Sequence, residues 1–426
     1  MYLSLKSGNF VLKQPDGTFF SYLFNDTRMT IGINESAEEI LTCLNGQYSY
    51  DMLINYFSKK YEESIEEVNY LLRDFIDNLK NNNVLMETVD KKERMTVRGS
   101  KDYYTPEHIT LELTHKCPLN CKHCFLSAGV LGNEMPLEKS IYLTKELLNT
   151  GVRIFQLTGG EPFTFVGIGK IINLLIENDA SVHVTTSGYI NTKKVKSCLD
   201  SLAVSKDPLI QVSIDGTERI HNNIRGRKDA YRRTIQFIKE CRSRNLPTIV
   251  STILIDQSLE EIIELTGIIK KLGVKEQRLG IITNQGRAVE NRLDGYTYKK
   301  YKSILQYLKS TFDDDNFTVE EIEEECNDLK DCGAGYKTLK ITPKLMVTPC
   351  AMMQMNIGNL NRESLEKVLI RSYQTFSKLE FPSSKYCKDC VQEEYCKGCI
   401  SEAVIRKDTV DECKWQNSQV LTETLS

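Results

Sequence analysis

The sequence predicts an α/β protein: a partial (β/α)6 TIM-like barrel, preceded by a small winged-helix-like α+β domain and followed by a small cysteine-rich domain. Three observations support this. Between residues 103 and 312, apolar segments alternate six times with helical patterns. Residues 1–90 combine short apolar segments with an amphipathic helix, and eight of the fourteen cysteines lie from Cys326 on. At 426 residues the chain has room for two or three domains, each with its own core.

The first domain, residues 1–90, has the elements of a winged helix. Short apolar segments at 10–12 and 19–20 predict strands, and 84–86 predicts a wing-like strand after the Asn81–Asn83 turn. One apolar stripe predicts a helix through Val68, Leu71, Leu72, Phe75, Ile76 and Leu79. The domain holds fourteen Asp or Glu against seven Lys or Arg, a net charge of −7 that would repel phosphates. This charge favours a peptide-binding module over a DNA-binding one.

The second domain, residues 103–312, follows a polar linker at 87–101. Its six apolar segments predict parallel strands, each followed by a helix: 109–113, 154–158, 182–185, 209–214, 248–254 and 279–282. The regular repeat favours a barrel-like closure over an open sheet. The acidic runs at 313–315 and 320–325 predict a solvated helix face or linker, after which the cysteine-rich tail, residues 313–426, begins.

Polar motifs follow the first four predicted strands, where parallel architectures place their active sites. In chain order the motifs are Cys117, Cys121 and Cys124; Gly159-Gly160-Glu161-Pro162; Thr186-Ser187-Gly188; and Ser213 with Asp215-Gly216. Three thiolates spaced CxxxCxxC can hold three irons of a four-iron cluster and leave the fourth iron open for an external ligand. A three-cysteine zinc site, with His123 or His115 as fourth ligand, is the alternative.

These motifs resemble those of the radical S-adenosylmethionine (SAM) superfamily over residues 103 to about 310. The resemblance rests on the CxxxCxxC loop, on Gly-Gly-Glu-Pro after the second strand and on the "SIDG" of the fourth. It implies that S-adenosylmethionine chelates the open iron and is cleaved to a 5'-deoxyadenosyl radical, which takes hydrogen from a substrate. It also implies that His123 lies under the adenine and that Arg225 pairs with the carboxylate of the cofactor. Further cofactor-binding residues implied by the resemblance are Gly159, Gly160, Glu161, Ser187, Ser213 and Asp215. Without the motif, Arg225 would be assigned to a surface salt bridge. Gly286-Arg287-Ala288 matches a family pattern with a structural role.

The tail cysteines resemble those of the SPASM domain, which holds two auxiliary four-iron clusters, so that the chain would carry three 4Fe-4S clusters in all. The resemblance assigns Cys332, Cys350 and Cys399 to the first auxiliary cluster, and Cys387, Cys390, Cys396 and Cys413 to the second. Cys326 either completes the first cluster or leaves an iron open to a substrate thiolate. A zinc ribbon built from the middle four cysteines is the alternative. Cys43, Cys198 and Cys241 lie in helical patterns and are predicted to be core residues.

The order of the domains indicates a function. The run from Ile33 to Phe57 resembles the PqqD-like element that binds the leader of ribosomally made, modified peptides, and the three parts together resemble the sactipeptide and ranthipeptide maturases. The leading hypothesis is an enzyme that joins a Cys sulfur to a carbon of another residue in a precursor peptide. Epimerisation, carbon-carbon crosslinking and formylglycine formation are alternatives on the same architecture. An iron-sulfur regulator that binds DNA is a further alternative, which the charge of residues 1–90 opposes.

The composition limits the partners. A net charge of −3 without a basic block indicates neither a nucleic-acid partner nor a membrane surface. The N-terminus lacks the pattern of a signal peptide and no apolar run reaches the length of a membrane span, so a cytoplasmic protein is expected. The expected partners are a precursor peptide, whose leader binds residues 1–90, and an external electron donor such as a flavodoxin or ferredoxin.

Overall fold

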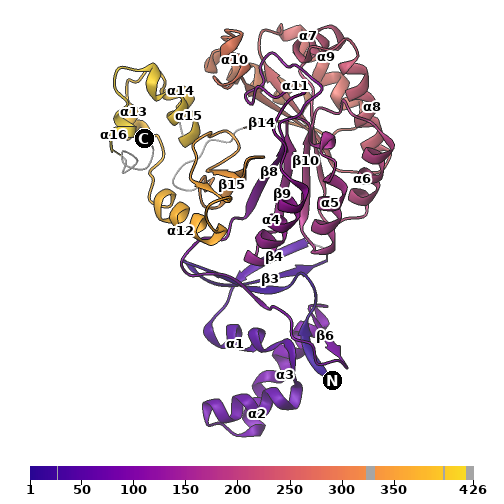
Figure 1. The fold of residues 1–426 in the computed structure, drawn as a ribbon, viewed down its shortest axis with the longest axis vertical. Coiled ribbons are helices and arrows are strands. Elements are labelled where there is room, and N and C mark those ends of the chain that lie inside the picture. Colours follow the sequence, from indigo (N-terminus) through magenta and orange to yellow (C-terminus); the bar gives the residue numbers. More distant parts are fainter. Residues whose placement is uncertain (26, 323–331, 397–398, 419–426) are drawn as a thin grey trace. The chain divides into compact units, whose positions relative to one another are not determined.

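The computed structural model describes residues 1–25, 27–322, 332–396 and 399–418. The chain forms two compact units (Figure 1). The first unit contains Met1–Thr105 together with the short pieces Lys145–Arg153 and Glu177–Ala180, and the second contains the remainder. Among the described residues, no helix is long and apolar enough to cross a membrane.

The first unit has two small sheets and three helices. One sheet has the order β5-β1-β6, and the other β4-β3-β2-β7. The strands are β1 (Tyr2–Leu5), β2 (Phe10–Gln14), β3 (Gly17–Phe24), β4 (Thr27–Gly32), β5 (Asn45–Ser49), β6 (Leu85–Thr88) and β7 (Val97–Gly99). The helices are α1 (Glu35–Cys43), α2 (Tyr50–Tyr61) and α3 (Ile65–Asn81). The predicted wing-like strand lies in the three-stranded sheet as β6, whereas the predicted strands at 10–12 and 19–20 lie in the four-stranded sheet as β2 and β3.

Helix α3 anchors the core of this unit. Val68, Leu72, Ile76 and Leu79 are buried, at intervals of three and four residues. The predicted stripe was too wide, because Leu71 is 64% exposed and Phe75 is only partly buried. Leu71 lies about 100° around the helix from Leu72, outside the face that the sheet covers.

The second unit is built on one ten-stranded sheet with the order β14-β13-β12-β11-β10-β9-β8-β15-β16-β17. Its central strands run parallel and are β8 (His108–Thr114), β9 (Ile154–Gly159), β10 (Ser181–Thr186), β11 (Leu209–Ser213), β12 (Thr248–Leu254) and β13 (Glu276–Ile281). The six predicted strands are therefore confirmed. Because β14 and β17 end the order, the barrel is partial.

Strands from the tail extend this sheet at both edges. β14 (Thr318–Glu321) pairs in parallel with β13, so the prediction of a helix face or linker at Glu320 was wrong. Residues 323–325 of that acidic run lie outside the described residues. β15 (Thr338–Ile341) pairs in parallel with β8, and a hairpin continues through β16 (Met346–Thr348) to β17 (Gly358–Asn359).

Helices cover one side of the parallel strands, and Figure 1 shows α5, α6 and α8 along it. The helices of this region are α4 (Leu137–Thr150), α5 (Ile168–Glu177), α6 (Lys193–Ala203), α7 (Glu218–Arg225), α8 (Ala230–Arg242), α9 (Leu259–Lys271), α10 (Arg287–Glu290) and α11 (Tyr298–Phe312), with a 3-10 turn η1 (Pro162–Thr164). Cys198 on α6 and Cys241 on α8 are buried, as predicted, whereas Cys43 is half-buried.

The strands alternate between an apolar outer face and a polar inner face. In β10, Val182 and Val184 are fully buried, whereas His183 and Thr185, which alternate with them along the strand, are half-buried. On the inner face, Thr110 Oγ1 lies 3.4 Å from Gln156 Oε1, and Gln156 Nε2 donates to Thr185 Oγ1 at 2.8 Å. The inner face therefore presents hydrogen-bonded polar groups to a cavity.

The tail beyond the hairpin is helical. Its helices are α12 (Leu365–Phe376), α13 (Ser384–Cys387), α14 (Glu393–Cys396), α15 (Ile400–Arg406) and α16 (Lys414–Ser418), with a 3-10 turn η2 (Lys407–Thr409). A small core of its own joins Met353, Ile400, Ala403 and Trp415 to several of the tail cysteines.

Candidate active site

The predicted motifs meet around one cavity of 510 Å³ at the carboxyl ends of the strands. Every predicted residue of the barrel lines this cavity except Glu161: Cys117, Cys121, His123, Cys124, Gly159, Gly160, Ser187, Ser213, Asp215 and Arg225. The opposite wall comes from the tail and includes Ala351, Met352, Tyr395 and Cys399. Barrel and tail thus share one site within the second unit.

The three loop cysteines, Cys117, Cys121 and Cys124, pack together in one apolar cluster after β8. Cys117 and Cys121 are buried and Cys124 is partly exposed. Burial raises the pKa of the Cys117 thiol to about 12, so this group becomes a thiolate only when a cation or a metal centre stabilises it. Arg225 supplies one such charge, because its Nη1 lies 3.6 Å from Cys121 Sγ.

The loop that carries these cysteines is fixed by its backbone. The amides of Asn120 and Lys122 donate to the carbonyls at the end of α7 at 3.2 and 2.9 Å. Arg287 binds the loop from the other side: its amide donates to Cys124 O at 2.9 Å, its Nε to Cys121 O at 2.7 Å and its Nη1 to Ala128 O at 2.7 Å. Gly286 has φ +54°, and a Cβ there would lie 2.5 Å from the carbonyl oxygens of Cys124 and Phe125. Gly286 and Arg287 therefore hold the loop in place.

Arg225 and Asp215 form a buried ion pair at the cavity wall. Arg225 Nη2 lies 2.6 Å from Asp215 Oδ2, and the side chains are 9% and 0% exposed. Burial opposes ionisation of Asp215, but Arg225, with His123 and His221, lowers its pKa below the usual value. The pair is thus no surface salt bridge. Among the described residues, no acceptor hydrogen-bonds to the buried Arg225 Nε.

His123 lies between the loop cysteines and this pair. Its Nε2 is 4.0 Å from Asp215 Oδ2, and its Nδ1 is buried without a hydrogen-bond partner among the described residues. Burial lowers the pKa of His123 to about 4, so its ring is neutral at pH 7. A neutral ring on the cavity wall suits stacking on a flat apolar ligand face.

Glu161 is fully buried and holds a neighbouring loop. Its carboxylate accepts hydrogen bonds from Thr186 Oγ1 at 2.7 Å, from the Ser187 amide at 3.0 Å, from Ser187 Oγ and from the Phe163 amide at 3.2 Å. The side chain therefore fixes Ser187, which does line the cavity. Gly159 and Gly160 pack on the end of β8, where a Cβ would lie 2.0 Å from Thr114 O and 2.6 Å from Lys116 O respectively.

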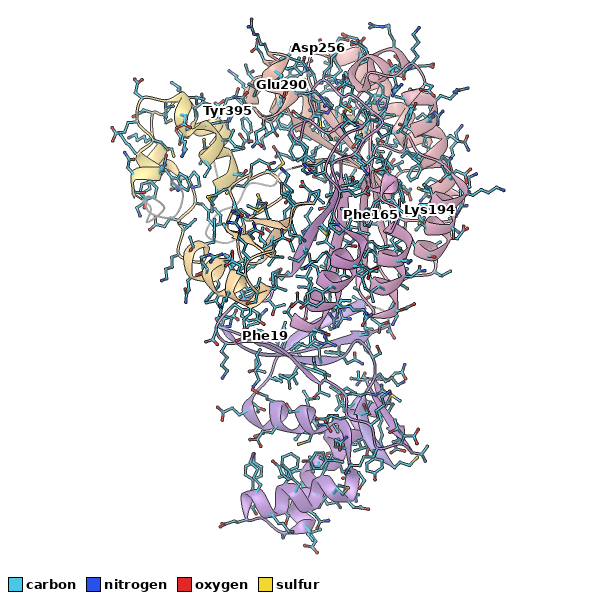
Figure 2. The ribbon with its side chains drawn as sticks, in the orientation of Figure 1. Phe19, Phe165, Lys194, Asp256, Glu290 and Tyr395 are labelled. Carbon is cyan, nitrogen blue, oxygen red and sulfur yellow. The ribbon has the colours of Figure 1, made fainter. Side chains whose placement is uncertain are left out.

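The tail wall is aromatic and charged. Tyr395 on α14 is labelled in Figure 2, and its ring centroid lies 6.0 Å from that of Tyr298 on α11. The Tyr298 amide donates to Tyr395 Oη at 3.3 Å. Arg406 lies 4.0 Å from the centroid of the Tyr395 ring and pairs with Glu402 at 2.7 Å. These contacts join α11 of the barrel to α14 and α15 of the tail beside the cavity.

The structure brings several of the tail cysteines near one another. Cys387, Cys396 and Cys413 contact the same small core, and the charges of Cys390 and Cys413 act on Cys387. The charge of Cys332 acts in the same way on Cys350, which is partly buried. Cys399 lines the cavity. Cys326 lies outside the described residues. Among the described residues, no three His, Cys, Asp or Glu side chains are arranged around a single metal ion.

Comparison with known proteins identifies the two cysteine-rich regions. Residues 111–269 match the Radical SAM superfamily, and residues 332–391 match the SPASM iron-sulfur cluster-binding domain. The chain is a radical SAM protein with a SPASM domain. These families imply 4Fe-4S clusters and S-adenosylmethionine. The residues at the cavity fit both groups, because three thiols lie together there. Beside them is the buried guanidinium of Arg225, whose Nε has no hydrogen-bond partner among the described residues.

Two relatives are named for the biosynthesis or the maturation of a product. The radical SAM SPASM chain is 25% identical over 345 residues to the antilisterial bacteriocin subtilosin biosynthesis protein AlbA of Bacillus subtilis, covering 79% of this chain and 76% of AlbA. It is 27% identical to the sporulation killing factor maturation protein SkfB of the same organism, covering 64% of this chain and 67% of SkfB.

Solved structures share the fold. SuiB of Streptococcus suis bound to S-adenosylmethionine aligns with a TM-score of 0.64 at 16% identity, covering 96% of this radical SAM SPASM chain and 98% of SuiB. Another SuiB structure contains the precursor peptide SuiA. Native anSMEcpe with bound AdoMet aligns with a TM-score of 0.57 at 18% identity, covering 73% of this chain and 93% of that one.

Sequence reasoning missed the polar lining of this radical SAM cavity below the rim. Gln156, Thr185, Gln211, Ser251 and Arg278 all line it. The signal was present in the sequence: within the first four predicted strands, polar residues occupy alternate positions, which parallel strands buried on both faces do not show.

Proposed function

We propose that this protein joins a Cys sulfur to a carbon of another residue in a ribosomally made precursor peptide. The cavity carries the proposal, because one wall holds the loop cysteines and the other holds Cys399 and the residues after Cys350. A substrate in this cavity is in reach of both sets of iron ligands. The names of AlbA and SkfB, a subtilosin biosynthesis protein and a maturation protein, support a peptide substrate.

In this proposal the loop cysteines hold a 4Fe-4S cluster whose open iron binds S-adenosylmethionine, and the bound cofactor supplies a 5'-deoxyadenosyl radical. Gly159, Gly160 and Ser213 contact the cofactor, and His123 lies along the adenine. Glu161 acts through Ser187, which its carboxylate orients. Arg225 offers its remaining donor to the cofactor carboxylate, while Asp215 keeps the guanidinium in place.

The proposed reaction removes two hydrogen atoms from the peptide for each crosslink. One leaves a carbon as a hydrogen atom and ends in 5'-deoxyadenosine. The Cys thiol releases a proton when its sulfur bonds to that carbon, and an auxiliary cluster held by the tail cysteines would accept the remaining electron. One electron from an external donor, such as a flavodoxin or ferredoxin, begins each turnover.

Residues 1–90 are proposed to bind the leader. The sheet β5-β1-β6 has edges to which an extended peptide can add as a further strand, because β5 and β6 are its end strands in the described part of the chain. The edge of β6 is the more open, since the Arg94 amide already donates to Asn45 O of β5 at 2.8 Å. Tyr70 and Leu71 on α3 are 72% and 64% exposed and offer apolar contacts. Such exposure is costly for a surface with no partner.

The decisive experiment supplies the anaerobically reconstituted protein with reductant, S-adenosylmethionine and its own precursor. The expected product is lighter by two hydrogens for each crosslink, and tandem mass spectra place the link on a Cys. An unchanged product mass contradicts the proposal and, with an inverted α-carbon, indicates epimerisation. A carbon-carbon link would place this protein beside the relatives named PqqA peptide cyclase, which are 23–24% identical.

Metal analysis tests the cofactors separately. About twelve irons per chain are expected, four for each of three clusters. Cys117→Ala should remove about four irons, whereas Cys241→Ala, a buried cysteine of α8, should remove none. About four irons together with zinc would instead make the tail a zinc module and leave the crosslinking electron without its acceptor.

A further inference from the structure

A lysine is fully buried where the tail joins the barrel. Lys340 lies on β15, its side chain is 0% exposed, and its strand pairs with β8, which leads into the loop cysteines. Burying an ammonium group costs several kcal/mol unless charged and polar partners replace water. The partners of Lys340 therefore indicate why it is there.

Lys340 pairs with Glu112 of β8. Its Nζ lies 3.2 Å from Glu112 Oε1, and the Glu112 side chain is 2% exposed. The second carboxylate oxygen, Oε2, lies 3.1 Å from His115 Nε2. Glu112 lines the cavity, five residues before Cys117. The ion pair therefore extends from the strand of the radical SAM loop into the tail.

On the other side, Lys340 binds the segment that follows Cys350. Its Nζ donates to Ala351 O at 3.2 Å and to Gln354 Oε1 at 3.4 Å. The hairpin holds this geometry, because Lys340 is paired with Thr348, whose Oγ1 donates to Cys350 O at 3.1 Å. These hydrogen bonds place the ammonium group beside the segment that begins at Cys350.

We infer that the Lys340–Glu112 pair tunes the reduction potential of the auxiliary cluster bound by Cys350, with Lys340 raising the potential and Glu112 lowering it. The inference rests on the proposed assignment of Cys350 as a cluster ligand. Reduction adds a negative charge to the cluster, which a nearby ammonium stabilises and a nearby carboxylate destabilises. An ammonium or carboxylate group acts strongly on a nearby cluster in a buried region that excludes water.

A role in stability alone would not explain the pair. Apolar side chains of similar volume often replace a buried ion pair without loss of stability. Glu112 also lines the cavity, and Lys340 binds the segment that follows Cys350. Lys340 is thus a positioning residue for electron transfer, acting through its charge on the proposed cluster.

The test is a potentiometric titration of the anaerobically reconstituted full chain, followed by electron paramagnetic resonance. Lys340→Met should shift the midpoint of the auxiliary cluster to lower potential, and Glu112→Gln should shift it to higher potential. The double variant should fall between the two. The control is Lys344→Met, an exposed lysine at the turn of the same hairpin, which should leave the midpoint unchanged because water screens its charge.

A variant of Cys350 tests separately whether this residue is a cluster ligand. If Cys350→Ala leaves the iron content and all the cluster signals unchanged, Cys350 is no ligand, and both the assignment and the inference fail. If the cluster is present but Lys340→Met and Glu112→Gln leave its midpoint unmoved, or shift it in the same direction, the inference alone is overturned. Should Lys340→Met fail to fold, the direction of the Glu112→Gln shift decides.

Discussion

Breaking the Arg225–Asp215 ion pair should loosen the radical SAM site without unfolding the protein. Both side chains are nine-tenths or more buried and their charged atoms are 2.6 Å apart. Removing one partner of such a pair costs about 3–5 kcal/mol, because the other charge remains buried. At about 1.4 kcal/mol per factor of ten, Arg225→Met should speed hydrogen exchange of the α7 amides, and of the loop amides that bond to α7, roughly 10²- to 10⁴-fold.

The pH dependence gives this prediction a sign. In the wild type, Arg225 and the neighbouring histidines hold the pKa of Asp215 below its usual value, so the pair stabilises the fold above the unfolded pKa and this stability is lost as pH falls through the folded pKa. In Arg225→Met, burial without the guanidinium should raise that pKa. The difference in amide hydrogen exchange between Arg225→Met and the wild type should then become smaller as the pH is lowered through the raised pKa of Asp215, because the protonated carboxyl group no longer carries a buried charge.

The assay is hydrogen exchange with mass spectrometry, comparing peptides that cover β11 to α8. Arg233→Met is the matched control, because Arg233 and Asp229 are also 2.6 Å apart but 47% and 31% exposed. It should change exchange by less than about tenfold. Replacing both buried partners, in Arg225→Met with Asp215→Leu, should restore much of the protection. Equal effects of Arg225→Met and Arg233→Met would refute the argument from burial.

Three further predictions follow from the same geometry. Gly286→Ala should lower the iron content by up to four irons per chain, because its Cβ would collide with the carbonyls of Cys124 and Phe125 and its φ of +54° costs about 1–2 kcal/mol; colorimetric iron analysis checks this. Glu161→Gln should weaken S-adenosylmethionine binding about ten- to a hundredfold, because an amide nitrogen cannot accept from Ser187, and equilibrium dialysis measures it. Leu71→Ser should weaken leader binding roughly fivefold in fluorescence anisotropy while the melting temperature stays unchanged.

The parts of the fold that the sequence predicts are those governed by local patterns. The apolar strands and the spacing of the loop cysteines were both readable, since alternation and ligand spacing are short-range. Leu71 shows the limit: it belongs to the apolar periodicity of α3, but the width of the face that the sheet covers depends on tertiary packing. Glu320 was misassigned for a similar reason, because an acidic segment can still form an edge strand when β13 offers it hydrogen bonds.

The charged contacts of the site could not be predicted in the same way. Glu112 and Lys340 are far apart in the sequence and meet only because β15 returns to pair with β8. Arg225 was predicted to face a ligand carboxylate, yet the carboxylate that it contacts here is its own Asp215. No spacing rule reports such a pairing, because it depends on how α7 packs against the end of β11.

The continuous sheet has a consequence for the independence of the barrel. β8 is an interior strand only because β15 covers it, and β13 only because β14 does. A fragment ending at residue 312 would leave both strands with unpaired backbone groups along an exposed edge, the arrangement that invites strand-to-strand aggregation. The catalytic barrel and the tail are therefore joined by main-chain hydrogen bonds as well as by a shared cavity, and neither can be exchanged for a foreign module without a replacement for these two strands.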